Sequence, residues 1–287
     1  MEASWYEIDE DRFFERFPGK PADAHKGTFG KILLICGGYG MAGAACLNII
    51  GAKTLGASYL HVALPDTIYP IAASRFLTPV YHPFDQKNAI ETLRSVLPQV
   101  RAVCFGSGAV QMPAKERILH FLLEQARVPL VLDAEALGLL SPAALDHRTC
   151  TAPLILTPHF GEFARLSGET AESAARDPLA HARRFAEAHG VIVALKGPNT
   201  VVASPDGRRY RNRSGNAALA QAGSGDVLTG LATAMLTFFS DPFEAACNAV
   251  WLHGHIADEG RKNHSCQCFP LEAFPKIMDR LFFVRGF

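Results

Sequence analysis

The segment AGSGDVLTG, residues 222–230, places a carboxylate where the backbone is suited to bind an anion. Gly223, Ser224 and Gly225 can adopt a turn that points successive N–H groups inward, and an apolar helical pattern follows them. The positive end of that helix would stabilise a phosphate and keep Asp226 ionised. A carboxylate beside a phosphate is suited to accept the proton of a hydroxyl group that attacks the phosphorus atom. Asp226 could equally be an ordinary helix N-cap.

Glycines and polar residues follow five short apolar runs that are typical of buried strands. The runs are KILLIC (31–36), VRAVCF (100–105), VPLVL (128–132), PLIL (153–156) and VIVAL (191–195), and they are followed by GGYGMAG, GSG, Asp133, TPHFGE and KGPNT. In an open parallel sheet, ligands bind beyond the carboxyl ends of the strands. The sequence therefore predicts a small-molecule site at one edge of the sheet.

Three of these residues have both a functional and a structural interpretation. Lys196 and the glycine after it provide a cation and a close approach of the backbone, which suits a nucleotide phosphate, but a solvated lysine at a strand end fits as well. His159 could face a substrate or could cap a helix. Glu162 is also a favourable acid for the first turn of a helix.

The elements that position these residues alternate between strands and helices. Helical patterns at 43–57 and 113–127 and a further strand at 59–64 lie among the five runs. Strands that are apolar throughout and separated by helices indicate a parallel sheet covered on both faces. Residues 200–212 predict a hairpin that turns at Pro205, Asp206 and Gly207, and two apolar helices follow at 225–239 and 242–260. We expect a single α/β domain over residues 1–287.

Composition excludes several classes of partner. The 287 residues contain 28 Lys and Arg and 28 Asp and Glu, which argues against nucleic acid or an anionic membrane as a partner. No apolar stretch of about twenty residues is present, and the acidic start lacks a signal-peptide pattern. Seven scattered cysteines indicate reduced thiols in a cytoplasmic protein.

No metal site is expected. Cys266 and Cys268, with His264 nearby, lack a second ligand pair at zinc spacing. His253 and His255 lie in an apolar helical pattern and are interpreted as packing residues.

The glycine-rich turn at 38–43 offers a competing interpretation. GYGMAG matches the dinucleotide-binding pattern, follows a predicted strand and opens a helix, and Asp66 comes after the next strand. A strand-to-helix turn requires glycine for steric reasons as well, and this interpretation leaves residues 222–230 without a role.

Six segments in order resemble the ADP/ATP-dependent NAD(P)H-hydrate dehydratases, which are ribokinase-like proteins. The resemblance covers about residues 25–280 and implies a three-layer α/β/α fold with a mostly parallel central sheet, preceded by a short N-terminal extension, residues 1–24. The segments are HKGTFGKILLICGG (25–38), GA (43–44), LDAEALGLL (132–140), LTPHFGEFARL (156–166), LKGPNT (195–200) and SGNAALAQAGSGDVLTG (214–230).

The resemblance implies an activity. The substrate would be the S-epimer of NADHX or NADPHX, a cofactor hydrated at its nicotinamide ring. A nucleotide, ADP or ATP and usually ADP in bacterial members, would phosphorylate the added hydroxyl with Mg²⁺ present. The ring nitrogen would then expel phosphate, restoring NADH or NADPH and, with ADP, leaving AMP.

The resemblance also implies roles for residues. Asp226 would be the catalytic base and contact the substrate, and Gly223, Ser224 and Gly225 would form the anion hole. The substrate wall would comprise Ala44, Gly108 and His159, and the nucleotide would be held by Lys196, Gly197, Pro198, Asn199, Thr200 and Gly225. The resemblance further implies a homotetramer that cooperates with a separate NAD(P)HX epimerase.

This chain departs from the family pattern at the substrate wall. It has GSGAV at 106–110 where GPGLG is frequent, DAEAL at 133–137 where DADAL is frequent, and Gly138 in place of a later asparagine. Three alternatives stay open: a ribokinase-like kinase for a vitamin precursor or sugar alcohol, an NAD-binding protein that uses GYGMAG, and a nucleotide-binding protein without activity.

Overall fold

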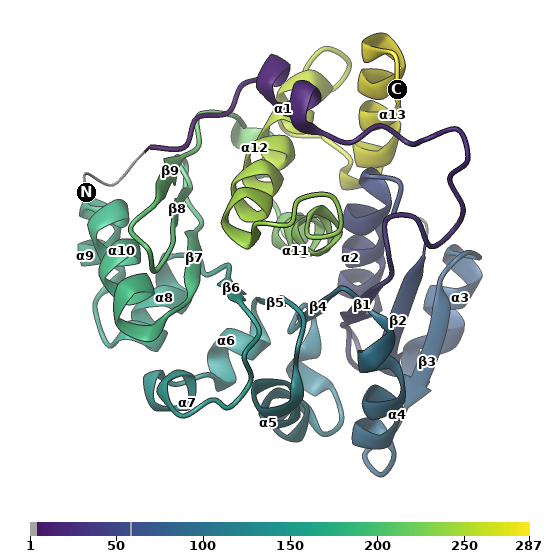
Figure 1. The fold of residues 1–287 in the computed structure, drawn as a ribbon, viewed down its shortest axis with the longest axis vertical. Helices are drawn as coiled ribbons and strands as arrows, with labels where there is room; N and C mark the ends of the chain where they lie inside the picture. The colour runs from purple at the N-terminus through teal and green to yellow at the C-terminus, as the bar shows by residue number, and fades with distance from the viewer. Residues whose placement is uncertain (1–4, 58) are drawn as a thin grey trace.

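The computed structural model describes residues 5–57 and 59–287, and within them one nine-stranded sheet forms the centre of the fold (Figure 1). The strand order is β3-β2-β1-β4-β5-β6-β7-β8-β9. Strands β1 to β7 pair in parallel, and β8 and β9 are antiparallel. The strands are β1 (Ile32–Ile35), β2 (Leu60–Pro65), β3 (Val80–Phe84), β4 (Ala102–Phe105), β5 (Leu130–Leu132), β6 (Leu154–Leu156), β7 (Ile192–Leu195), β8 (Val201–Ala203) and β9 (Arg209–Arg211).

Helices cover both faces of the sheet, which explains why the inner strands are apolar at every position. Figure 1 shows the sheet curving around one group of helices and carrying the other group on its outer side. The inner group is α1 (Glu10–Arg16), α2 (Ala42–Thr54), α3 (Tyr69–Arg75), α11 (Ser224–Met235), α12 (Pro242–Gly260) and α13 (Phe274–Arg285). The outer group is α4 (Ala89–Val96), α5 (Lys115–Gln125), α6 (Glu135–Leu139), α7 (Pro142–Asp146), α8 (Phe160–Ser167), α9 (Ala171–Arg176) and α10 (Pro178–His189). The predicted three-layer α/β/α fold is confirmed.

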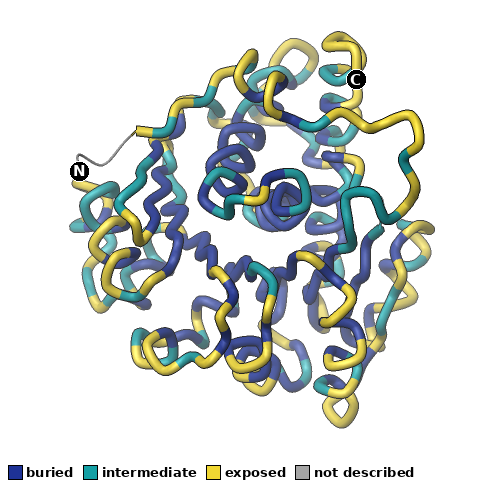
Figure 2. Tube along the Cα trace, in the orientation of Figure 1, coloured by how far each residue is buried: buried dark blue, intermediate teal, exposed yellow. Residues whose placement is uncertain are grey.

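Helix α11 lies at the centre of the inner layer, and most of it is buried (Figure 2). It touches α2 backbone to backbone at two glycines. A Cβ atom on Gly51 of α2 would lie 2.0 Å from the carbonyl oxygen of Val227, and one on Gly230 of α11 would lie 1.9 Å from that of Asn48. Any side chain at either position would separate the two helices.

Most predicted elements occur within a few residues of their expected ends. The predicted hairpin is β8 and β9, and its turn closes with a hydrogen bond from the Gly207 N–H to the Ser204 carbonyl. Strand β3 was not predicted. Its sequence VYHPF is largely half-buried or exposed at the sheet edge and contains Pro83, so it has no continuous apolar run.

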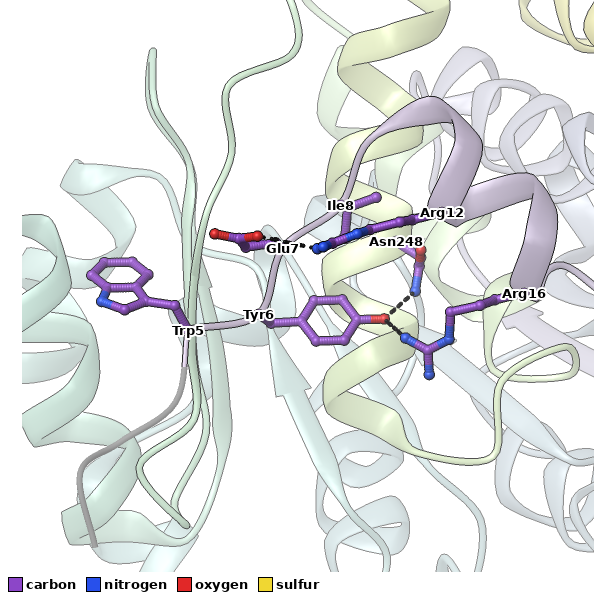
Figure 3. A pocket seen from close by; sticks show the side chains of 7 residues that line it. All are labelled: Trp5, Tyr6, Glu7, Ile8, Arg12, Arg16 and Asn248. Carbon is purple, nitrogen blue, oxygen red and sulfur yellow. Dashed lines mark hydrogen bonds and ion pairs between the residues drawn. The ribbon is translucent and has the colours of Figure 1, made fainter.

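The N-terminal segment packs onto the inner layer. Phe13, Phe14 and Phe17 are buried in the same core as α11 and α12. The Tyr6 hydroxyl accepts hydrogen bonds from Arg16 at 2.6 Å and from Asn248 of α12 at 3.3 Å (Figure 3). Because the described part of residues 1–24 contributes to this core, we propose that residues 1–287 form one domain. None of the described helices combines the length and apolar content needed to span a bilayer.

Candidate active site

The carboxyl ends of β5 and β7 meet in an ion-paired cluster. Lys196, directly after β7, places Nζ 2.7 Å from Oδ1 of Asp133, the residue after β5, and 3.8 Å from Oε2 of Glu162 on α8. The other oxygen of Asp133 accepts a hydrogen bond from Thr229 on α11 at 2.8 Å. The site predicted at the sheet edge therefore includes contributions from β5, β7, α8 and α11.

The N-terminus of α11 faces this cluster and has no side-chain cap. Its N-cap is Gly223, with φ 91°, and no side chain accepts from the first turn, whereas Asp241 caps the neighbouring helix α12. Asp226 is the third residue of α11, so the alternative in which it serves as the N-cap is wrong. The first amides of a helix have no intrahelical acceptor, which leaves this end suited to an anion.

Ser224 and Gly225 are held from two sides. His253 of α12 lies with Nε2 3.0 Å from the Ser224 carbonyl oxygen. A Cβ atom at Gly225 would lie 3.4 Å from Lys196 Nζ, so the ammonium group sits against the start of the helix. Burial lowers the pKa of His253 to about 4, so the ring is neutral and donates its Nε2 proton to this carbonyl.

Asp226 is held in an environment that favours its proton. Burial, followed by the negative charge of Asp133, raises the pKa of Asp226 to about 6, while hydrogen bonding by Ser107 and the charge of Lys196 act in the opposite direction. Burial opposes the charge on Lys196, but Asp133 and Glu162 raise the pKa of its ammonium group above the ordinary value. The cluster therefore holds a permanent cation beside a carboxylate that can exchange a proton near neutral pH.

The three residues predicted to line the substrate lie on three different segments. Ala44 of α2 is buried, and Gly108 packs against it with φ 65°, because a Cβ at Gly108 would lie 2.6 Å from the Ala44 Cβ. His159 caps α8: its Nδ1 accepts from the backbone N–H groups of Gly161 and Glu162 at 2.9 and 3.2 Å. The structure thus shows the capping role considered for His159, and a neutral ring then carries its proton on Nε2.

The predicted nucleotide loop, residues 196–200, is a turn closed by Thr200, whose hydroxyl oxygen accepts from the Gly197 N–H at 3.3 Å. Gly197 faces a ring, since a Cβ there would lie 2.8 Å from Cζ of Phe160. Pro198 and Asn199 are exposed. The loop thus starts in the ion-paired cluster and ends at the surface.

The glycine-rich turn after β1 packs against the turn that follows β4. The Gly37 N–H donates to the Ser107 carbonyl at 2.7 Å, and a Cβ on Gly38 would lie 2.9 Å from the Gly108 carbonyl oxygen. The first glycine of the turn is therefore packed against residues 108–112, whereas a Cβ atom at Gly40 or Gly43 would meet no atom within 4 Å.

The remaining sequence candidates are the cysteines and histidines that were considered as metal ligands. Within the described ranges, no three His, Cys, Asp or Glu side chains are grouped so that they could hold a metal ion. His253 is buried and His255 nearly so, and His253 also contacts the start of α11 through Ser224. A cavity of about 800 Å³ lies beside Tyr6, Tyr210 and Trp251, and no predicted site residue lines it.

The curved, mostly parallel sheet and the uncapped helix N-terminus at its carboxyl edge define a ribokinase-like α/β protein. The NAD(P)H-hydrate dehydratase family matches residues 32–279, and the chain belongs to that family.

Similar proteins support this assignment. The ADP-dependent (S)-NAD(P)H-hydrate dehydratase of Bacillus subtilis is 32% identical over 272 residues, covering 95% of this chain and 96% of that protein. The enzyme of the same name from Neisseria meningitidis is 38% identical over 250 residues, covering 86% and 82%. The bifunctional NAD(P)H-hydrate repair enzyme Nnr of Moorella thermoacetica is 35% identical over 86% of this chain, and the match spans only 48% of that protein.

A solved structure shows the same fold. The ADP/ATP-dependent NAD(P)H-hydrate dehydratase of Bacillus subtilis, co-crystallised with ATP and Mg²⁺, superposes with a TM-score of 0.86 at 30% identity. The match covers 96% of this chain and 97% of that one. The interpretation as a dinucleotide-binding protein that uses GYGMAG is set aside by this family membership.

Proposed function

We propose that this protein is a nucleotide-dependent (S)-NAD(P)H-hydrate dehydratase that uses ADP as its phosphoryl donor. The observation that carries the proposal is the position of Asp226, in the first turn of an uncapped helix and beside the Lys196–Asp133 pair. Family membership and relatives whose names carry this activity support it.

The phosphoryl transfer uses two parts of the site, one that binds the phosphoryl group and one that accepts a proton. Lys196 and the amides of Gly223, Ser224 and Gly225 bind and orient the transferred phosphoryl group of the nucleotide. Asp226 accepts the proton of the ring hydroxyl as its oxygen attacks the β-phosphorus of ADP, and AMP leaves. The O–P bond to the substrate forms as the bond to AMP breaks.

The second step restores the nicotinamide. The lone pair of the ring nitrogen expels inorganic phosphate by breaking the C–O bond, and loss of a proton from the adjacent carbon restores the ring double bond. Ala44, Gly108 and His159 orient the hydrate, and the buried part of this wall at Ala44 limits the access of water. The sum is ADP and NADHX to AMP, phosphate and NADH.

Magnesium belongs to the nucleotide in this proposal. The carboxylates of Asp133 and Glu162 are already engaged by Lys196, so these two residues do not offer free carboxylates to a metal ion. Mg²⁺ usually binds through substrate phosphates with few protein ligands. We therefore expect Mg²⁺ to enter as the nucleotide complex and to neutralise the phosphate charge.

The activity is tested by following the absorbance of the reduced nicotinamide ring with NADHX and Mg²⁺, with ADP, with ATP and without nucleotide. We expect a rise that requires nucleotide and is faster with ADP. A stable phosphate ester formed without NADH would instead identify a kinase. No product with either nucleotide, in a protein that binds both, would contradict the proposal.

The role of Asp226 is tested with Asp226→Asn, which keeps the size of the side chain and removes the base. We expect turnover to fall by at least about 10³-fold while the Kd for ADP changes only a few-fold. Asp279→Asn in α13, an exposed position, is the matched control and should retain full activity. Near-normal turnover of Asp226→Asn would contradict the mechanism.

Three broader features complete the proposal. We propose a homotetramer, testable by light scattering, and cooperation with a separate NAD(P)HX epimerase, which is suggested by the bifunctional relatives. A cytoplasmic location is supported by seven free cysteines, five of them buried.

A further inference from the structure

Ser107 lies in the segment where this chain departs from its family, between two glycines with positive φ, Gly106 and Gly108. Its side chain is fully buried, although it carries a hydroxyl group that must find partners. The turn follows β4 and places Ser107 at the carboxyl edge of the sheet, next to the candidate active site.

A chain of buried side chains fixes which way the Ser107 hydroxyl points. The Cys104 thiol donates to Oδ1 of Asn48, with Sγ and Oδ1 3.5 Å apart. The Asn48 amide nitrogen donates to Ser107 Oγ at 3.0 Å. Because Asn48 supplies the proton in this bond, the Ser107 proton must go to a different acceptor.

The Asp226 carboxylate is suited to that role, because Ser107 acts on the pKa of Asp226 as a hydrogen-bond partner of the ionised form, which lowers it. The arrangement is anchored mechanically, because the backbone of Asn48 is in contact with α11 at Gly230, one turn beyond Asp226. Cys104, Asn48 and Ser107 are each at most 1% exposed, so water does not compete for these bonds.

We propose that Ser107 is a positioning residue for the Asp226 carboxylate, oriented for donation by Asn48 and Cys104. This inference rests on the proposed function, in which Asp226 is the base. A proline at this position, as in GPGLG, has no hydroxyl group to donate. This chain therefore orients its base through a hydroxyl donor that the GPGLG pattern does not supply.

Several charged and titratable groups besides Ser107 affect the pKa of Asp226. Asp133 after β5 and Glu162 on α8 raise the pKa of Asp226, Lys196 after β7 lowers it, and Cys36 after β1 is close enough to interact. His253 reaches the helix through Ser224 and is neutral. Ser107 lowers the pKa because its hydrogen bond stabilises the ionised carboxylate.

The test is the pH profile of kcat/KM for Ser107→Ala. We expect the acid limb to move to higher pH by about 0.5 to 1 unit, with the plateau at high pH within about threefold of the wild type. Asn48→Leu should move the limb in the same direction by less, and the double variant should move it no further than Ser107→Ala. A residue with only a structural role would lower stability without moving this limb.

A second measurement does not depend on turnover. Titration of the Asp226 carboxyl carbon by NMR, assigned with Asp226→Asn, should show the same upward shift in Ser107→Ala. If wild-type protein has no dehydratase activity while this shift occurs, the proposed function fails and the hydrogen-bond inference stands. An unchanged titration in folded Ser107→Ala would overturn the inference.

The matched control is Ser204→Ala, because Ser204 is also buried and also donates to a carboxylate, that of Asp206. It should leave the Asp226 titration and the acid limb unchanged, and an equal shift there would overturn the inference. If Ser107→Ala does not fold, Ser107→Cys keeps the size with a weaker donor and should give a smaller shift of the same sign; no shift in that variant would also overturn it.

Discussion

Lys196 Nζ lies 2.7 Å from Asp133 Oδ1, and this ion pair joins the ends of β5 and β7 across the intervening strand β6. Asp133 is only 2% exposed, and its second oxygen is used by Thr229, so the carboxylate has no access to bulk water. Removing the lysine would leave this buried charge with a hydroxyl partner alone.

We therefore expect Lys196→Met to lower the free energy of unfolding by on the order of 3 kcal/mol, because it strands a buried carboxylate. The double variant Lys196→Met, Asp133→Asn should lose less than the single variant, since the charge is then absent. Urea denaturation measures both. The exposed pair Lys262–Glu259 is the control, and Lys262→Met should cost less than about 1 kcal/mol. A double variant less stable than Lys196→Met would contradict this account.

The pH dependence of activity should report Asp226. Because burial and Asp133 raise its pKa to about 6, the base is protonated and inactive below that pH and ionised above it. We expect kcat/KM to rise through an acid limb centred near pH 6 and then to level off. If kcat/KM is already level at about pH 5 while nucleotide binding is unaffected, the pKa of the Asp226 base is not raised in this way.

The contact between α2 and α11 predicts a large difference between two similar substitutions. Gly51→Ala places a Cβ 2.0 Å from the Val227 carbonyl oxygen, so the helices must separate and we expect a loss of more than about 3 kcal/mol of stability. In the same helix, a Cβ atom at Gly43 would meet no atom within 4 Å. Gly43→Ala should therefore leave the stability unchanged or raise it by up to about 1 kcal/mol. Thermal unfolding of both variants is the measurement, and equal melting temperatures would contradict the packing.

Two stacked histidines on β2 and β3 should make stability depend on pH. His61 Nδ1 lies 2.8 Å from His82 Nε2; burial lowers the pKa of His61 to about 4 and lowers that of His82 below its ordinary value of 6.5. The unfolded chain binds these protons more readily, so stability is full above pH 6.5 and is lost as pH falls towards 4. His61→Phe with His82→Phe should flatten the denaturation midpoint over this range. His120→Gln, at an exposed position, should leave the slope unchanged.

The sequence was sufficient for the parallel core and for the edge at which the site lies. Strands β1, β4 and β7 are uninterrupted apolar runs, and the residues that follow them must meet because parallel strands end on one side. Strand β3 could not be predicted in this way, since Pro83 and the exposure of the edge remove the signal.

The interaction partners of the site residues were harder to predict from the sequence. The pairing of Lys196 with Asp133 depends on β6 lying between β5 and β7. The local hydrophobic pattern of a sequence does not determine the order of strands in a sheet. The capping role of His159 depends on where α8 begins, so the sequence left its two interpretations open. Asn48 and Thr229 were missed, because a single polar residue in an apolar helical pattern looks the same whether or not it faces a site.

The glycine contact at Gly51 and Gly230 has a mechanical consequence. Ala44 on α2 and Asp226 on α11 belong to helices whose backbones are in contact. The two helices therefore move as one rigid body and do not close towards each other around a ligand. The separation of Asp226 from Ala44 is therefore set when the protein folds.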